Sequence, residues 1–476
     1  MSISPFVIKM EDITRTPWLG VRPFTCYFTK QALPDFIKKY SAKGYERLGK
    51  FVLTLRSGEY IPKDNYASAE TNYVYLSVNN FSKGYLNLTE CTYLETDAGE
   101  KYSSMKVEDG DIIITRSGTV GRVAVFHVPE KMIEKTFIPS HHLAIIKTST
   151  PRDHLFLKYY LSFSFCKDFF DALSTGKVQK EITNWAIRKI PIPLLLNRSL
   201  LKKEFSKIDK WIGALEIKNV SLQTIVDEVL TQFKLKTNAE STYRAETLVP
   251  CLKDVAQNRA IRLGAQYNAF WLNHDGHLFE GTDKKWQNAP LKRTARMAQK
   301  IVLKKGVLPQ PRTLIDFDQV ESPNGRITDF ENIVAELGSG RIEFGNCDFL
   351  TNKLRPYLGY TILNKPEDKL IGTTEFIPFV IRNKSKVSVE YLRCLLLSTE
   401  YLEKSKFLMS GKEHPRINSI DILNIKVPLP DIKTQRAIVK EIKKREAKSQ
   451  KAREIIKKLR EQIDKLILEA LSKNGN

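Results

Sequence analysis

The feature that most constrains this chain is a stretch without proline or glycine, from Asp431 to Ser472. It is rich in residues that favour helix, and Asp431 is placed to cap the start of that helix. About 40 residues at about 1.5 Å each give a rod of roughly 60 Å. Apolar side chains recur along it at steps of four and three, at Ala452, Ile456, Leu459, Ile463, Leu466 and Ala470. That spacing is typical of a coiled-coil seam, which has to be buried against a partner.

A second stretch of the same chain can supply that partner. Between Leu200 and Phe233 the apolar positions are Phe205, Ile208, Ile212, Leu215, Leu222, Val226, Val229 and Phe233. The step from Leu215 to Leu222 passes Asn219, a polar residue on the seam that can fix the register of pairing. We predict that the helices pair through these residues: Leu215, Leu222, Val226 and Val229 of the first and Ile456, Leu459, Ile463 and Leu466 of the second. Two surface helices, each packed on its own domain, are the simpler alternative.

The sequence also repeats itself once over a long period. Gly110 and Gly176 match Gly345 and Gly411, in each case 235 residues further on. The motif IPIP at 190–193 matches VPLP at 427–430, and each leads into one of the helical stretches. A repeat of this length is too long for a solenoid unit, so it predicts two similar domains.

Each copy has the patterns of a mixed α/β domain. Ile112–Ile114 and Val123–Phe126 predict short buried strands on either side of a glycine turn. Residues 154–173 and their counterparts 389–407 predict one amphipathic helix in each copy. The polar segment 237–247 predicts a linker between the copies.

Charge indicates the kind of partner. The 476 residues include 76 Lys and Arg against 54 Asp and Glu, a net charge of +22, and the basic residues run through the whole length. A chain this basic usually binds a polyanion, which favours nucleic acid. No apolar run approaches the ~20 residues of a membrane span. Six scattered cysteines without a CxxC pair predict free thiols and a cytoplasmic protein.

The motifs of common catalytic sites are missing from the sequence. It has no phosphate-binding GxxxxGK[ST] or GxGxxG loop, and no Asn-Pro-Pro-aromatic or Asp-Pro-Pro-aromatic loop of an amino-methyltransferase. A nuclease set of Asp431, Glu441 and Lys443 would be spread along one helix rather than converge. The histidines at 141–142 and at 274 and 277 lack accompanying ligands for a metal. We therefore predict no catalytic residues and no metal site.

Basic loops at equivalent places in both copies point to binding instead. Arginine can grip phosphate or read guanine, serine and threonine can bond phosphate, and glutamine can read adenine. The candidate DNA-binding residues of the first copy are Arg116, Ser117, Thr119, Arg122, Lys177, Gln179 and Lys180. Those of the second copy are Lys353, Arg355, Tyr357, Lys412 and Arg416. Taken singly, each loop could equally be a surface turn with solvated charge.

These residues resemble a known family. GDIIITRSGTVGRVAVF at 110–126, TNKLRPYLGY at 351–360, the loops STGKVQKEI and SGKEHPRINSIDI that lead to IPIP and VPLP, and the helix opening DIKTQRAIV are similar to DNA specificity subunits of type I restriction-modification systems. The resemblance implies an α+β fold with two target-recognition domains, separated by two long antiparallel helices that form a coiled coil. The corresponding boundaries are 1–44 for an N-terminal segment, 45–193 for the first domain, 194–236 for the first spacer helix, 237–254 for a linker, 255–430 for the second domain and 431–476 for the second spacer helix.

The resemblance also implies a function and a set of partners. Such a subunit reads a bipartite target on double-stranded DNA, and is not itself an enzyme. Two methyltransferase subunits and the restriction subunits would dock on it and carry S-adenosylmethionine, ATP and Mg²⁺, so this chain would hold no cofactor. Two alternatives remain: a self-contained DNA methyltransferase or nuclease with a fused recognition module, and a coiled-coil scaffold that binds only protein.

Overall fold

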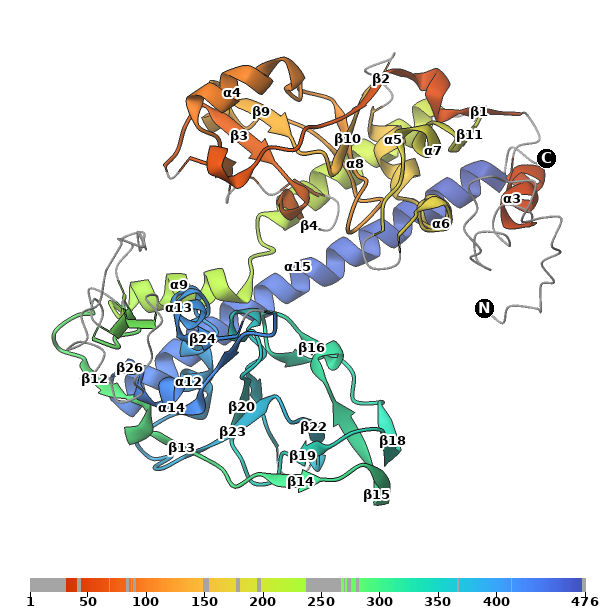
Figure 1. The fold of residues 1–476 in the computed structure, drawn as a ribbon. Helices are drawn as coiled ribbons and strands as arrows, with labels where there is room; N and C mark the ends of the chain where they lie inside the picture. Colours follow the sequence, from red (N-terminus) through yellow and green to blue (C-terminus); the bar gives the residue numbers. More distant parts are fainter. Residues whose placement is uncertain are drawn as a thin grey trace. The chain divides into compact units, whose positions relative to one another are not determined.

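The computed structural model divides into two compact units, each with one copy of the repeat. Unit 1 consists of residues 1–215 and 454–476, and unit 2 of residues 216–453. Helix α15 (Ile432–Ser472) is continuous and contributes to both units (Figure 1). The structure describes residues 31–40, 44–67, 69–82, 85–86, 88, 91–148, 154–176, 180–194, 198–236, 267–268, 270–271, 275–279, 282–365, 368–411 and 413–472. The predicted linker 237–254 lies outside these residues.

Unit 1 is built on a four-stranded antiparallel sheet with the order β2-β10-β7-β8. Its elements in chain order are α3 (Leu33–Tyr40), β1 (Tyr45–Arg47), β2 (Val52–Ser57), β3 (Tyr73–Leu76), β4 (Phe81–Ser82), β5 (Tyr85–Leu86), β6 (Thr92–Tyr93), α4 (Thr96–Tyr102), β7 (Ile112–Thr115), β8 (Val123–Val125), β9 (Thr136–Pro139), β10 (Leu143–Thr148), α5 (His154–Ser162), α6 (Ser164–Leu173), α7 (Asn184–Arg188), β11 (Pro191–Pro193) and α8 (Arg198–Glu216). Successive side chains of β7 point to opposite faces of the sheet and so enter two different cores. Ile112 and Ile114 pack toward the helices, and Ile113 packs toward β3 and β9.

Unit 2 repeats this plan. Its elements are α9 (Leu222–Gln232), β12 (Gln287–Pro290), β13 (Ala295–Met297), β14 (Ile301–Leu303), β15 (Gly306–Ile315), β16 (Val320–Glu321), β17 (Arg326–Ile327), β18 (Ile333–Leu337), β19 (Arg341–Glu343), β20 (Phe349–Asn352), β21 (Ile362–Leu363), β22 (Ile371–Thr373), β23 (Phe376–Ile381), α12 (Val389–Leu395), α13 (Thr399–Leu408), β24 (Met409–Ser410), β25 (Arg416–Ile417), α14 (Ser419–Asn424) and β26 (Lys426–Leu429). The counterpart sheet has the order β13-β23-β20-β21, and a parallel pair accompanies each sheet, β3 with β9 and β15 with β22. The predicted duplication is confirmed by this shared strand order.

The two proline-rich motifs form equivalent short strands. IPIP supplies β11, which pairs with β1 so that Pro193 lies opposite Tyr45. VPLP supplies β26, which pairs with β12 so that Leu429 lies opposite Gln287. Within the described residues both pairs are two-stranded, and an edge position suits proline because its nitrogen has no hydrogen to donate.

The helix predicted inside each domain is two helices, which corrects the sequence prediction. In unit 1 the break falls at Phe163, whose extended backbone separates α5 from α6. In unit 2 it falls at Ser398, whose hydroxyl accepts a hydrogen bond from the backbone of Tyr401 and starts α13. Apolar periodicity continues across both breaks, so it did not reveal them.

The first spacer helix is also divided. The stretch predicted as one helix over 194–236 forms α8 and α9, with a break that contains Asn219. Asn219 donates its backbone N–H to Glu216 O (3.0 Å), and Ser221 caps α9 by accepting from Thr224 N (3.1 Å). Short polar side chains of this kind compete with helix hydrogen bonds and favour caps. Asn219 therefore lies in the break between α8 and α9 instead of on a continuous seam.

Each of the two helices packs beside its own part of α15. In unit 1, Phe205, Ile208 and Ile212 of α8 share one core with the later part of α15, and Figure 1 shows the two helices antiparallel. In unit 2, Ser449 donates to Val220 O (2.8 Å), and Arg445 reaches Glu228 (3.1 Å) and Gln232 (2.7 Å) further along α9. That order of contacts is antiparallel as well.

The buried positions of α15 drift away from the predicted seam. Ala452, Ile456, Leu459 and Ile463 are buried, but the next buried residues are Ile467 and Leu471. The predicted Leu466 and Ala470 are partly buried at the margin of the same core, as is Leu215 of α8. A straight helix has 3.6 residues per turn, so a 3.5-residue repeat drifts by ~20° per heptad. Leu222, Val226 and Val229 are buried in the core of unit 2, with Ile438, Val439 and Ile442 of α15.

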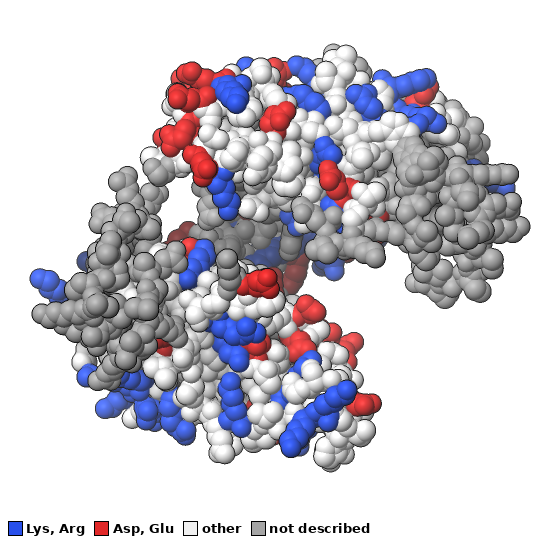
Figure 2. Space-filling model, in the orientation of Figure 1, with Lys and Arg blue, Asp and Glu red and all other residues white. Residues whose placement is uncertain are grey.

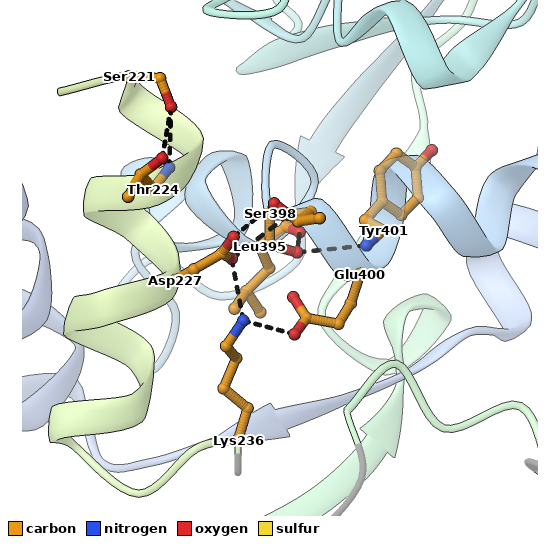
Figure 3. Close-up of polar contacts among 9 residues, drawn as sticks. Ser221, Thr224, Asp227, Lys236, Leu395, Ser398, Glu400 and Tyr401 are labelled. Carbon is orange, nitrogen blue, oxygen red and sulfur yellow. Dashed lines mark hydrogen bonds and ion pairs between the residues drawn. The ribbon is translucent and has the colours of Figure 1, made fainter. Parts of the chain in front are cut away.

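An ion cluster fastens α9 to α13 within unit 2 (Figure 3). Lys236 Nζ lies 3.3 Å from Asp227 Oδ1 and also pairs with Glu400 Oε1. Asp227 accepts hydrogen bonds from the backbone and the hydroxyl of Thr399 at the start of α13. The three charged side chains are between 12% and 19% exposed, so solvent screens their attraction poorly.

Candidate nucleic-acid interface

In unit 2, two predicted loops that are distant in sequence lie together. One follows β20 and contains Arg355, and the other joins β24 to β25 and ends at Arg416. Arg355 N donates to Pro415 O (2.9 Å), and Ile417 N donates to Lys353 O (2.9 Å). The backbone therefore makes one surface of the two loops.

A buried amide holds the first loop in an unusual conformation. Asn352 is fully buried, and its amide nitrogen donates to Leu354 O (2.7 Å) and Arg355 O (3.0 Å). Arg355 has φ +48°, in the left-handed region that non-glycine residues rarely adopt. Strain of this kind persists where the surroundings enforce it, and it occurs often at functional sites. The Arg355 side chain is exposed, with one guanidinium nitrogen on Glu413 O (3.2 Å).

A single carboxylate organises the cations of this surface. Glu375 accepts from Arg416 (3.0 Å), and Lys353 Nζ lies 3.8 Å away. Hydrogen bonds to Glu375, and next its charge, raise the pKa of Arg416. Tyr357 lies under Lys406, whose Nζ is 5.8 Å from the ring centre. The described loops thus carry more positive than negative charge, with an aromatic ring beside them.

Unit 1 brings the equivalent loops together in the same way. The turn after β7 contacts the loop after α6, because Gly118 N donates to Lys180 O (2.9 Å) and Ile182 N donates to Arg116 O (2.8 Å). Ser117 is buried in this contact, whereas Thr119 is exposed at the tip of the turn. Two of the predicted hydroxyls therefore differ in their access to a ligand.

The basic side chains of unit 1 also have partners within the protein. Arg116 donates to Ser57 Oγ and pairs with Glu181 (2.7 Å), and its side chain is only 17% exposed. Arg122 is half-buried and donates to Phe81 O (2.5 Å), which braces β4. Lys180 is well exposed and pairs with Asp171. A role of these residues in DNA binding stays a prediction.

Three of the predicted DNA-binding residues lie outside the part of the chain that the structure describes, and the sequence did not predict three residues that shape the site. Lys177, Gln179 and Lys412 lie outside the described residues. Three residues of the site were not predicted from the sequence: Asn352, and Glu181 and Glu375, which bind the arginines of the two loops. Glu181 and Asn352 stand inside the motifs that carry the resemblance, and a search for acids beside the basic loops would have found Glu181.

The described residues contain neither a candidate metal site nor a candidate membrane-spanning helix. Within them no group of three or more His, Cys, Asp or Glu side chains could hold a metal ion. Burial, and next the neighbouring His142, lower the pKa of His141, which favours a neutral ring at pH 7. Among the helices that can be described, none is both long and apolar enough to cross a bilayer.

Comparison with known proteins identifies a family. Residues 47–197 and 325–464, more than half of the chain, match the model of the type I restriction modification DNA specificity domain. Among solved structures, the chain is similar to the S subunit of a type I restriction-modification system from M. genitalium, with 16% identity, 90% of this chain and 95% of that chain covered, and a TM-score of 0.40. It is also similar to the HsdS subunit from Thermoanaerobacter tengcongensis, with 15% identity, coverage of 90% and 96%, and a TM-score of 0.26. A search of curated proteins gives no match.

Proposed function

The chain belongs to the family of type I restriction modification DNA specificity domains, and from this premise we propose how its parts divide the work. It is the subunit that gives such a system its DNA sequence specificity. Unit 1 and unit 2 each read one half of a split target on double-stranded DNA. One observation carries this proposal: both copies of the fold join a basic turn to a second loop at the same place.

Joining two readers in one chain has a physical advantage. Once one half-site is bound, the second reader is held near its own half-site at a high effective concentration. Two weak readers can then bind a long target tightly while each makes only a few base contacts. Helix α15 contributes residues to both units and so links the two readers within one chain.

The chemistry on the DNA belongs to partner subunits. Two methyltransferase subunits, and restriction subunits where they are present, dock on this chain in the cytoplasm. S-adenosylmethionine, ATP and Mg²⁺ act on those partners, and this chain is not catalytic. Its own contribution is to bind DNA and to position the partners on it.

A domain exchange tests the division into two readers. Replacing residues 45–192 with the same region of a related subunit should change one half of the methylated motif and leave the other half unchanged. The motif is measured by sequencing methylated bases in cells that carry the chain with its methyltransferase. The reciprocal exchange of 255–429 is the control, and it should change the opposite half. A motif that changes in both halves, or in neither, contradicts the proposal.

Arg416→Ala tests whether the joined loops lie on DNA. If Arg416 binds a phosphate, the variant should bind all sequences more weakly and lose about 0.9 from the slope of log K against log salt. If it reads a base, discrimination at one position should fall by about 1–3 kcal/mol. Binding of the full chain to labelled duplex DNA measures both. Arg436→Ala removes the same charge from an exposed position on α15 and serves as the control. Equal binding by Arg416→Ala and the parent would place these loops away from DNA.

A further inference from the structure

Unit 2 contains a long basic segment that the loops described above do not include. From Lys284 to Ile315 the chain has no Asp or Glu. Six cations in the middle of this segment are all exposed: Lys292, Arg293, Arg296, Lys300, Lys304 and Lys305. Repulsion among like charges destabilises such a segment in the free protein, so a polyanion bound along it would relieve a cost already present.

The same segment exposes apolar side chains. Met297 is 42% exposed, Ile301 51%, Val302 58% and Val307 81%. These residues lie on β13, β14 and the start of β15, and β13 and β14 are the edge strands of two different sheets. We call residues 296–307 the basic edge. Apolar side chains between lysines are a combination that protein surfaces use against DNA, where cations meet phosphates and apolar groups meet sugars and base edges.

The basic edge is continuous with the candidate interface of unit 2. Desolvation by surrounding protein atoms, and next the charge of Lys353, lower the pKa of Lys300 although its side chain is exposed, and the charge of Glu375 acts in the opposite direction. Lys353 and Glu375 are the residues that join Arg416 to the first loop. Lys300 is therefore a neighbour of that cluster. Figure 2 shows Lys and Arg side chains on the part of unit 2 that contains β14 and β15 in Figure 1.

We propose that the basic edge is a second DNA contact of unit 2, which holds the duplex beside the half-site that the loops read. Lys300, Lys304 and Lys305 bind phosphates, and Val307 lies against the sugar edge of a groove. The acids near this edge include Glu336, which lies opposite Val307 on β18. Asp316, Glu343 and Glu375 are also near, and they are paired with Arg341, Arg312 and Arg416. The lysines thus keep an excess of positive charge. This inference rests on the proposed function, because the loops have to bring DNA within reach.

The test is the double variant Lys304→Ala with Lys305→Ala in the full chain, with Lys284→Ala and Lys285→Ala as the matched control. The control removes the same charge from exposed lysines of the same acid-free segment, near β12, which lies at the other end of unit 2 from β15 (Figure 1). Binding is measured to a random-sequence duplex and to a duplex with the methylated motif, over a range of salt. Loss of two phosphate contacts should reduce the salt slope by about 1.8 and weaken binding roughly 10- to 100-fold at ~0.1 M salt, equally for both duplexes. The control should keep the parent's slope.

Three outcomes would overturn the inference. If the parent binds DNA and the double variant has the same slope, the basic edge is not at DNA, while the proposed function stands. If the control loses as much as the double variant, the effect comes from net charge alone. If the parent does not bind DNA, the proposed function fails together with the inference. Val307→Ser provides a second readout: it should weaken binding at an unchanged salt slope, and equal binding would remove the apolar contact from the proposal.

Discussion

Replacing Leu459 and Ile463 together with aspartate is expected to unfold the core of unit 1. Both side chains are buried, 7% and 2% exposed, in a cluster that includes Phe205 of α8 and Phe156 and Phe169 of the recognition domain. Truncating one such residue to alanine costs about 2–5 kcal/mol, and an unpaired charge in an apolar core costs more. A domain is stable by only about 5–15 kcal/mol, so two buried charges should exceed the stability of unit 1.

The measurement is thermal and urea unfolding of the full chain, with limited proteolysis to locate the unfolded part. Cleavage should appear in unit 1 and spare unit 2, whose core holds other residues. Ile455→Asp and Leu468→Asp are matched controls, because these side chains of α15 are 44% and 38% exposed. They should change stability by no more than ~1 kcal/mol. A double variant that keeps unit 1 folded would show that α15 is not part of its core.

Lys236→Met is expected to destabilise unit 2 by about 3–5 kcal/mol at neutral pH, the usual cost of breaking a buried ion pair. Without Lys236, Asp227 and Glu400 face each other with no cation between them. Burial, and next the charge of Asp227, raise the pKa of Glu400 already in the parent. The folded state therefore binds this proton more tightly than the unfolded state, and the stability contributed by Glu400 is lost as pH rises through the raised pKa.

Because the pKa of Glu400 is raised, the stability lost in Lys236→Met should depend on pH. As pH falls toward the raised pKa of Glu400, protonation removes one of the two charges, so the difference in unfolding free energy between Lys236→Met and the parent should shrink. Denaturant unfolding at a series of pH values measures it. Lys443→Met is the matched control, because its pair with Glu390 also joins two elements of unit 2 but is 60% and 39% exposed. The control should lose at most ~1 kcal/mol. Equal losses in the two variants, or a loss that grows as pH falls, would contradict this account.

The sequence predicted those parts of the fold that depend on local or repeated patterns. The seam of α15 could be predicted from Ile456, Leu459 and Ile463, because their spacing is a local pattern. The duplication could be predicted because matching glycines recur at a fixed offset. The helix breaks near Asn219 and at Ser398 were missed. Ser221 and Ser398 each cap the helix that follows through one hydrogen bond, and the apolar period continues across both breaks. The drift to Ile467 and Leu471 depends on how straight the helix is, which packing decides.

The candidate site likewise has features that the sequence predicted and features that depend on the folded structure. The basic turns could be found by composition, but not the partners of their side chains. Arg116 contacts Ser57, 59 residues away, and Arg416 contacts Glu375, 41 residues away. These pairs exist only when the sheets have formed, so a free arginine and a braced arginine look alike in the sequence. The left-handed backbone of Arg355 is imposed by Asn352 and is equally invisible there.

The discontinuity of unit 1 has a consequence for how the protein is made. Unit 2 is a contiguous segment, whereas unit 1 needs residues after 453 to complete its core. On the ribosome the first domain therefore emerges early but waits, with Phe205, Ile208 and Ile212 of α8 uncovered, until the last turns of α15 have been synthesised. A product whose translation stops before Glu454 leaves that apolar surface open to chaperones and proteases. We expect a chain truncated before Glu454 to fold unit 2, which is contiguous, and to leave the core of unit 1 incomplete.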